Sequence, residues 1–282
     1  MQSLYFLTII KMTKKPLTSF ERKEIKFLLS KKQKQDFLSL IDRYLKADEY
    51  GDKGKYQLMS LYYDSPEKDF YREKKMRLLH RKKLRLRRYV GENPKLQTSD
   101  QVFVEIKEHT EAMNYKRRVV LTADEAFTLL REWIMSRSIK PEDYAVIKEI
   151  ETLISKYSLE PSVVVSYQRQ AYKVDKKDGG LRITFDQQVS YRIKQLSLDR
   201  SNDVQLLDNG MEIMEIKVKG ELPLWTQEAL KICGIEQVNF SKYAYALEKG
   251  ISEWLVPPIK MVVSWNLIHD HKSEFLLAEV LN

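Results

Sequence analysis

Alternation of polar and apolar residues with a period of two predicts that this chain consists mainly of β-strands. In residues 80–90, Arg85 and Arg87 lie on one face of an extended segment, and Leu84 and Leu86 lie on the other. Eight such segments occur, with turn-forming glycines and prolines between several of them. The expected strands cover residues 20–29, 56–64, 80–90, 102–109, 114–121, 162–173, 181–186 and 211–219.

Helical spacing of apolar residues predicts six helices between or after these strands. Ser30 is expected to cap the first helix, and Pro66 is expected at the first helical position of the second. Thr122, followed three residues later by Glu125, has the pattern of a capping box. The expected helices cover residues 31–47, a short stretch from 65, 122–137, 141–157, 225–233 and 240–249. The combination predicts an α+β fold.

The chain divides into one long structured region and two ends. Residues 20–250 are expected to form a single domain, and residues 1–19 a disordered leader, with Met12 as an alternative start. Residues 251–282 form a C-terminal tail whose role the sequence leaves open, either a docking tail or a strand and helix that bind a protein partner. No apolar run approaches the roughly 20 residues of a membrane helix, and one cysteine excludes a disulfide framework. We expect a cytoplasmic protein without a transmembrane segment.

The charge composition adds to this picture, because charged residues are abundant and positive ones outnumber negative ones. Charged residues make up 32% of the chain, and Lys and Arg outnumber Asp and Glu by 49 to 40. The usual charged fraction is about 25%. A net charge of +9 favours an anionic partner, such as nucleic acid, anionic lipid or a phosphate-rich small molecule. The strict alternation within residues 80–90 argues for a strand inside a fold and against a nucleic-acid-binding arm.

The polar faces of at least five strands repeat Glu-x-Lys or Arg-x-Arg. A sheet with one solvated face is the ordinary explanation of such alternation. The apolar faces, however, can be covered by the expected helices, which would turn the charged faces inward. We therefore expect an antiparallel eight-stranded β-barrel with helices outside and a charged lumen, in which cations outnumber carboxylates and suit a polyanion. The carboxylates that would partner these cations, or bind Mg²⁺ or Mn²⁺, are Glu24, Glu105, Asp186 and Glu215.

Seven segments, in this order, resemble the VTC domain, the catalytic part of the vacuolar transporter chaperone polyphosphate polymerase. They are residues 20–27, 61–65, 84–89, 105–107, 166–172, 215–217 and 240–243. The VTC domain belongs to the CYTH group of triphosphate tunnel metalloenzymes. The resemblance implies a tunnel that binds a nucleoside triphosphate and Mn²⁺ or Mg²⁺. In polymerase members the terminal phosphate of ATP is transferred to a growing inorganic polyphosphate chain.

The resemblance also implies a role for individual residues. The implied phosphate- and ATP-binding residues are Lys26, Arg85, Arg87, Lys107, Lys116, Arg118, Tyr167, Arg169, Lys217, Ser241 and Lys242. Of these, Arg85, Arg87, Lys107 and Arg169 are expected to be catalytic. Glu215 is the implied principal metal ligand, with Glu24 and Glu105 beside it. This chain has Asn239 where the polymerase pattern has a further lysine, which removes one phosphate contact.

Three functions remain open at this point. The first is phosphoryl transfer from ATP to polyphosphate. The second uses the same site with water as acceptor, which would make the chain an inorganic triphosphatase or nucleoside triphosphatase, with Glu24 or Glu105 orienting the water. The third is a non-catalytic sensor of polyphosphate or nucleotide. The retained carboxylates favour an enzyme, because a pure anion binder gains nothing from Glu215.

Overall fold

The computed structural model describes residues 22–91, 93, 95–111, 114–132, 140–199 and 203–255. The expected leader, residues 1–19, and residues 256–282 of the expected tail lie outside these ranges. All eight expected strands and all six expected helices are present. The last helix continues to Leu255, five residues beyond the expected domain end.

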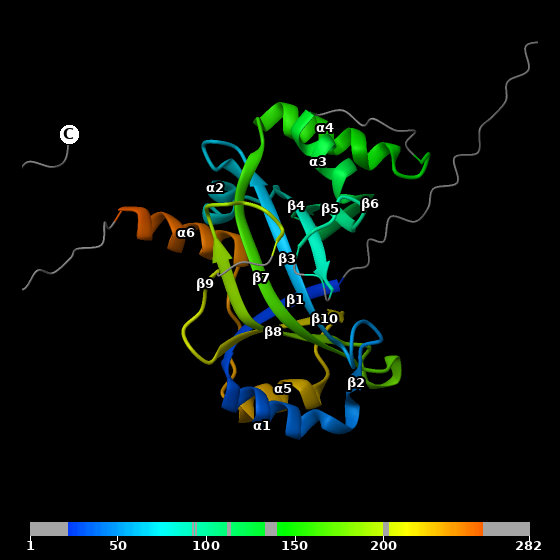
Figure 1. Ribbon diagram of the computed structural model, residues 1–282. Coiled ribbons are helices and arrows are strands. Elements are labelled where there is room, and N and C mark those ends of the chain that lie inside the picture. Colours follow the sequence, from blue (N-terminus) through cyan, green and yellow to red (C-terminus); the bar gives the residue numbers. More distant parts are fainter. Residues whose placement is uncertain are drawn as a thin grey trace, which may run out of the picture.

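The strands form one antiparallel sheet (Figure 1). Their bounds are β1 (Arg22–Ser30), β2 (Lys46–Ala47), β3 (Lys55–Asp64), β4 (Arg81–Val90), β5 (Gln101–His109), β6 (Asn114–Thr122), β7 (Glu160–Lys173), β8 (Arg182–Arg192), β9 (Val204–Gln205) and β10 (Met211–Lys219). The hydrogen-bonded order is β1-β10-β8-β7-β3-β4-β5-β6, with β2 added to β7 and β9 added to β8.

The expected closed barrel of eight strands is wrong in closure and in number. The sheet has ten strands, and β1 and β6 stand at opposite ends of its hydrogen-bonded order. The sheet curls until side chains bridge the two edge regions: Lys107 Nζ on β5 lies 3.0 Å from a carboxylate oxygen of Glu24 on β1. The additional strands β2 and β9 have two residues each, which is too short for a period of two to be recognised.

Most helices begin close to the expected positions, whereas several end elsewhere, and the expected residues 133–137 of the third helix lie outside the described residues. Their bounds are α1 (Lys31–Ile41), α2 (Asp69–Lys75), α3 (Ala123–Glu132), α4 (Tyr144–Tyr157), α5 (Leu224–Ile232) and α6 (Lys242–Leu255). The turns Asp42–Tyr44 and Lys176–Asp178 are 3₁₀. The first helix was expected to reach residue 47 but ends at Ile41, because a 3₁₀ turn and β2 follow it.

Side chains determine where three of the helices begin. Ser30 and Gln33 form a capping box on α1, and Thr122 and Glu125 exchange hydrogen bonds at the start of α3, as expected. The expected start of α2 at Pro66 is wrong, because Lys68 adopts a left-handed φ of 61° that a helix cannot contain. The helix starts at Asp69 instead.

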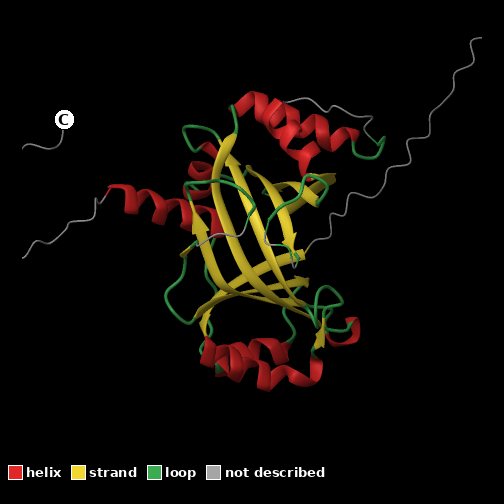
Figure 2. Cartoon of the chain, in the orientation of Figure 1, coloured by secondary structure: helices red, strands yellow, loops and turns green. Residues whose placement is uncertain are grey.

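Helices α1, α3, α4 and α5 cover the outer, apolar faces of the sheet (Figure 2), whereas α6 packs in a third core that includes the cavity residues Tyr62 and Tyr167. Helices α3 and α4 pack on the outer face of β3 to β6, in a core that includes Leu84, Leu86 and Ile106. Helices α1 and α5 pack on β1, β8 and β10, in a second core that includes Ile183 and Ile216. Because these faces are covered, the alternate residues of the same strands point to the concave side, and the expected convergence of the charged faces is confirmed.

Candidate functional site

A cavity of about 670 Å³ occupies the concave side of the sheet. The residues that the resemblance assigned to the site all line it except Glu105, so thirteen side chains from six strands, the loop before α6 and the first residue of α6 lie in one space. The lining residues are Glu24, Lys26, Tyr62, Lys83, Arg85, Arg87, Lys107, Asn114, Tyr115, Lys116, Arg118, Tyr167, Arg169, Arg182, Glu215, Lys217, Ser241 and Lys242. Eleven of them are Lys or Arg, and only two are carboxylates.

Five lining residues were missed by sequence reasoning. Lys83 and Arg182 share a strand face with predicted residues, so the period of two on β4 and β8 already contained the signal. Tyr62 could be found in the same way, since it lies opposite Arg85 in the register of β3 and β4. Asn114 and Tyr115 lie at the start of β6, just before the predicted residues Lys116 and Arg118.

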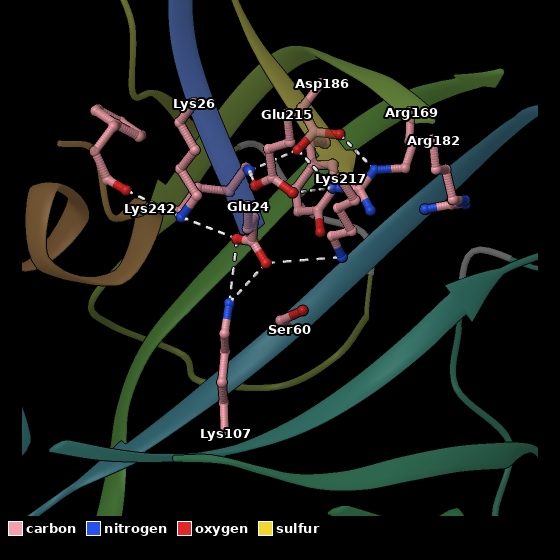
Figure 3. A network of polar contacts seen from close by, with 12 residues as sticks. Glu24, Lys26, Ser60, Lys107, Arg169, Arg182, Asp186, Glu215, Lys217 and Lys242 are labelled. Carbon is pink, nitrogen blue, oxygen red and sulfur yellow. Dashed lines mark hydrogen bonds and ion pairs between the residues drawn. The ribbon is translucent and has the colours of Figure 1, made fainter. Parts of the chain in front are cut away.

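Glu24 is the centre of one group of charges. Both of its carboxylate oxygens accept a hydrogen bond from Lys107 Nζ, at 3.0 and 3.1 Å. The ammonium groups of Lys26 and Lys217 lie 3.4 and 3.8 Å from the same carboxylate (Figure 3). Burial raises the pKa of Glu24, but the charges of Lys107, Lys26 and Lys217 together outweigh it, and the pKa lies well below its ordinary value. Glu24 is therefore ionised at every physiological pH.

Glu215 belongs to a second, deeper group. Its Oε1 accepts a hydrogen bond from Lys242 at 3.0 Å, and its Oε2 lies 3.6 Å from Arg169. Arg169 is held by a bidentate pair with Asp186, at 2.6 and 2.8 Å. Burial raises the pKa of Glu215, and the charges of Lys242, Lys26 and Arg169 lower it well below its ordinary value. Asp186 is buried and orients Arg169 and Lys242 toward the cavity.

Glu105 is the one predicted residue that does not line the cavity. It is 2% exposed and accepts a hydrogen bond from Arg85 Nε at 2.7 Å, with Lys116 Nζ on its other oxygen. Arg87, 3.8 Å from the same carboxylate, donates to Ser60 Oγ and Tyr167 Oη. Glu105 therefore lies under three cations and fixes their positions, while their remaining N–H groups face the cavity.

Several lysines in the cavity have a lowered pKa. Burial and the charge of Arg85 lower the pKa of Lys116 from 10.5 to about 8, although Glu105 opposes this shift. Burial, Lys107 and Arg169 likewise lower the pKa of Lys217. Burial, followed by Lys26 and Lys107, lowers the pKa of Lys83 well below its ordinary value. These shifts follow first from burial and then from neighbouring positive charges, and a bound polyanion would oppose both effects by stabilising the charged lysines.

The carboxylates of the cavity fit a metal ion that is shared with a ligand. Within the described part of the chain, no three His, Cys, Asp or Glu side chains gather closely enough to hold a metal by themselves. Glu24 and Glu215 occupy adjacent strands, with Lys26 directly opposite Glu215 in the register. Two carboxylates suit Mg²⁺ or Mn²⁺, which complete their coordination with phosphate oxygens and water. Glu105, enclosed by cations, is less accessible to such an ion.

Comparisons with known proteins agree with this geometry. The model of the VTC domain family matches residues 21–250. Vacuolar transporter chaperone complex subunit 4 of Trypanosoma brucei brucei is 27% identical over 239 residues, which is 74% of this chain. The chain spans about 30% of the length of that relative.

Solved structures with similar coordinates are more distant in sequence. A putative adenylate cyclase from Bacillus halodurans has a TM-score of 0.42 and 18% identity, covering 78% of this chain and 95% of that one. A putative adenylyl cyclase from Hippeastrum has a TM-score of 0.42 and 13% identity, covering 80% and 95%. Among the described residues, none of the helices has the length and apolar composition that a bilayer crossing needs.

Proposed function

Because this chain belongs to the VTC domain family, we propose that it transfers the terminal phosphate of ATP to a growing inorganic polyphosphate chain. The observation that carries the proposal is the lining of the cavity, in which eleven Lys and Arg face two carboxylates. Such an excess suits two polyanions held together, a nucleoside triphosphate and the end of a polyphosphate. The relative from Trypanosoma brucei brucei, a subunit of the vacuolar transporter chaperone complex, supports the same assignment.

The protein's part in this reaction is to position phosphates and to neutralise charge. Arg85, Arg87, Lys107 and Arg169 would hold the transferred phosphate, and the guanidinium groups of the three arginines are already oriented by Glu105, Ser60 and Asp186. Pre-oriented donors need no reorganisation when charge develops in the transition state. The remaining predicted residues, Lys26, Lys116, Arg118, Tyr167, Lys217, Ser241 and Lys242, would bind the other phosphates of the donor and acceptor.

Glu215 and Glu24 would hold Mn²⁺ or Mg²⁺ together with phosphate oxygens. When bound, the ion would supply Lewis-acid stabilisation of charge on the transferred phosphate. The acceptor phosphate is itself anionic and needs no general base. Water as acceptor does need one, and the pKa values of Glu24 and Glu105 lie well below the ordinary range, which makes both carboxylates weak bases. This favours transfer to phosphate over hydrolysis.

One assay separates the three candidate functions. The full chain is incubated with ATP and Mn²⁺, with and without a short polyphosphate primer, and the products are resolved by chain length. We expect a long polymer with stoichiometric ADP. Free phosphate as the main product would assign the chain to the triphosphatases. ATP that remains unchanged under all conditions, while still bound, would make the chain a sensor.

The lowered pKa of Lys116 predicts that phosphate binding weakens above pH 8. Below about pH 8 the ammonium is charged in the free protein; above it the group is increasingly neutral, and a bound polyanion must restore the proton. Affinity for tripolyphosphate should therefore fall as the pH rises from 8 to 10, with proton uptake on binding. Calorimetry in buffers of different ionisation enthalpy measures that uptake.

The variant Lys116→Arg is the control, because arginine stays charged throughout this range. Titration of the ligand itself and of Lys83 is common to both proteins, so the difference between them isolates Lys116. The same proton uptake in wild type and Lys116→Arg would contradict the assignment of Lys116 to the binding site.

A further inference from the structure

A second cavity of about 270 Å³ continues from the first toward α2 and the loop before α6. The two cavities share the lining residues Glu24, Lys26, Lys83, Lys107, Asn114 and Ser241. Beyond these, the second cavity has lining residues that the main one lacks, among them Lys74, Arg81, His109 and Asn239. We call Lys74, Arg81 and Asn239 the second mouth.

Lys74 brings a positive charge into the second mouth from a helix. Its Nζ donates a hydrogen bond to the side-chain oxygen of Asn239 at 2.6 Å. An amide fixes the direction of an ammonium group without neutralising it, whereas a carboxylate would cancel its charge. Burial, followed by the charges of Arg81 and Lys26, lowers the pKa of Lys74, so the group lies in a positive environment. The neighbouring Lys75 points elsewhere and pairs with Glu248 at 2.8 Å.

The charge of the second mouth continues that of the main cavity. Lys26, Lys83 and Lys107 lie between them, and Lys83 donates to Ser241 Oγ at 2.8 Å. Glu24 is the only acidic residue that lines the second cavity. Cations that continue from the main cavity through Lys26, Lys83 and Lys107 to Lys74 and Arg81 suit an anion with a charge on every repeating unit.

We propose that the second mouth binds the phosphates of a linear polyphosphate that extend beyond those held in the main cavity. Lys74 is the binding residue and Asn239 is its positioning residue. Asn239 replaces the lysine of the polymerase pattern, but a cation is still present there, because Asn239 accepts a hydrogen bond from Lys74 on α2. That the ligand is polyphosphate rests on the proposed function. What the second mouth adds is stronger binding of long chains than of short ones.

The test compares two ligands on one variant. Affinities for long-chain polyphosphate and for tripolyphosphate are measured by calorimetry without nucleotide or metal, on the full chain. Lys74→Gln should weaken long-chain binding about tenfold, the loss of roughly one charged contact, and change tripolyphosphate binding less than twofold. The slope of log K against log salt for the long chain should fall by about one. Lys74→Arg should retain the wild-type values.

Lys75→Gln is the matched control, since it removes the same charge from the adjacent position of α2. It should leave both affinities unchanged, and Asn239→Ala should weaken long-chain binding less than Lys74→Gln does. Equal long-chain affinities of Lys74→Gln and Lys75→Gln would overturn the inference, and so would an equal loss for both ligands in Lys74→Gln or no long-chain binding by the wild type. Because no turnover is measured, a chain that binds in this way but makes no polymer would refute only the proposed function.

Discussion

Glu215→Gln should lower turnover at least a hundredfold, which corresponds to about 2.7 kcal/mol of transition-state stabilisation. The change keeps the size of the side chain and removes its charge, so a metal ion held as proposed would lose its principal oxygen ligand. Binding of tripolyphosphate without metal should be retained or tightened, because a carboxylate inside the phosphate site is gone. Activity as a function of Mn²⁺ concentration measures the first effect, and calorimetry measures the second.

Loss of stability must be separated from loss of chemistry, because Glu215 also pairs with Lys242 and Arg169. Glu212→Gln is the matched control. Glu212 lies on the same strand and is buried, and it forms an ion pair of 2.9 Å with Lys34 outside the cavity. Both variants should melt at lower temperature, and only Glu215→Gln should lose turnover per folded molecule. Wild-type turnover with an unchanged Mn²⁺ midpoint would remove Glu215 from the metal site.

The sequence predicts which side chains line the cavity better than it predicts whether the sheet closes into a barrel. Each cavity residue on β4, such as Arg85, alternates with a core residue such as Leu84, and the two environments impose this alternation on the sequence. The same reasoning reached Lys107 and Glu215 on other strands. Arg182 and Lys83 carried the same signal and were not selected, because the family resemblance did not include them.

Closure of the sheet and the second mouth could not be predicted from the sequence. Whether β1 pairs with β6 depends on how far the sheet curls, and no local pattern encodes that angle. Lys74 is one of many lysines on short helices, and only the fold brings it to Asn239. The start of α2 depends on the left-handed Lys68 and on the buried Asp64, which accepts hydrogen bonds from the amides of Phe70 and Tyr71.

Glu105→Gln should lower the free energy of unfolding by about 3 kcal/mol or more, because it leaves cations without their buried counter-charge. Arg85, Arg87 and Lys116 all lie on this one carboxylate, which is 2% exposed. Urea unfolding at pH 7 measures the loss. The charges of these three cations keep the pKa of Glu105 well below its ordinary value, despite burial that raises it. The difference between wild type and variant should therefore shrink as the pH falls below about 4.5.

Glu108→Gln provides the comparison on the same strand. Glu108 lies on the other face of β5 and pairs with Arg117 at 2.7 Å, and Arg117 keeps Glu149 as a second partner. The control should cost no more than about 1 kcal/mol. Tripolyphosphate should raise the melting temperature of Glu105→Gln more than that of wild type, because its charge replaces the missing carboxylate above Arg85 and Lys116. The Mn²⁺ midpoint for activity should stay unchanged if Glu105 acts through these cations, whereas a large shift with little loss of stability would return Glu105 to the metal site.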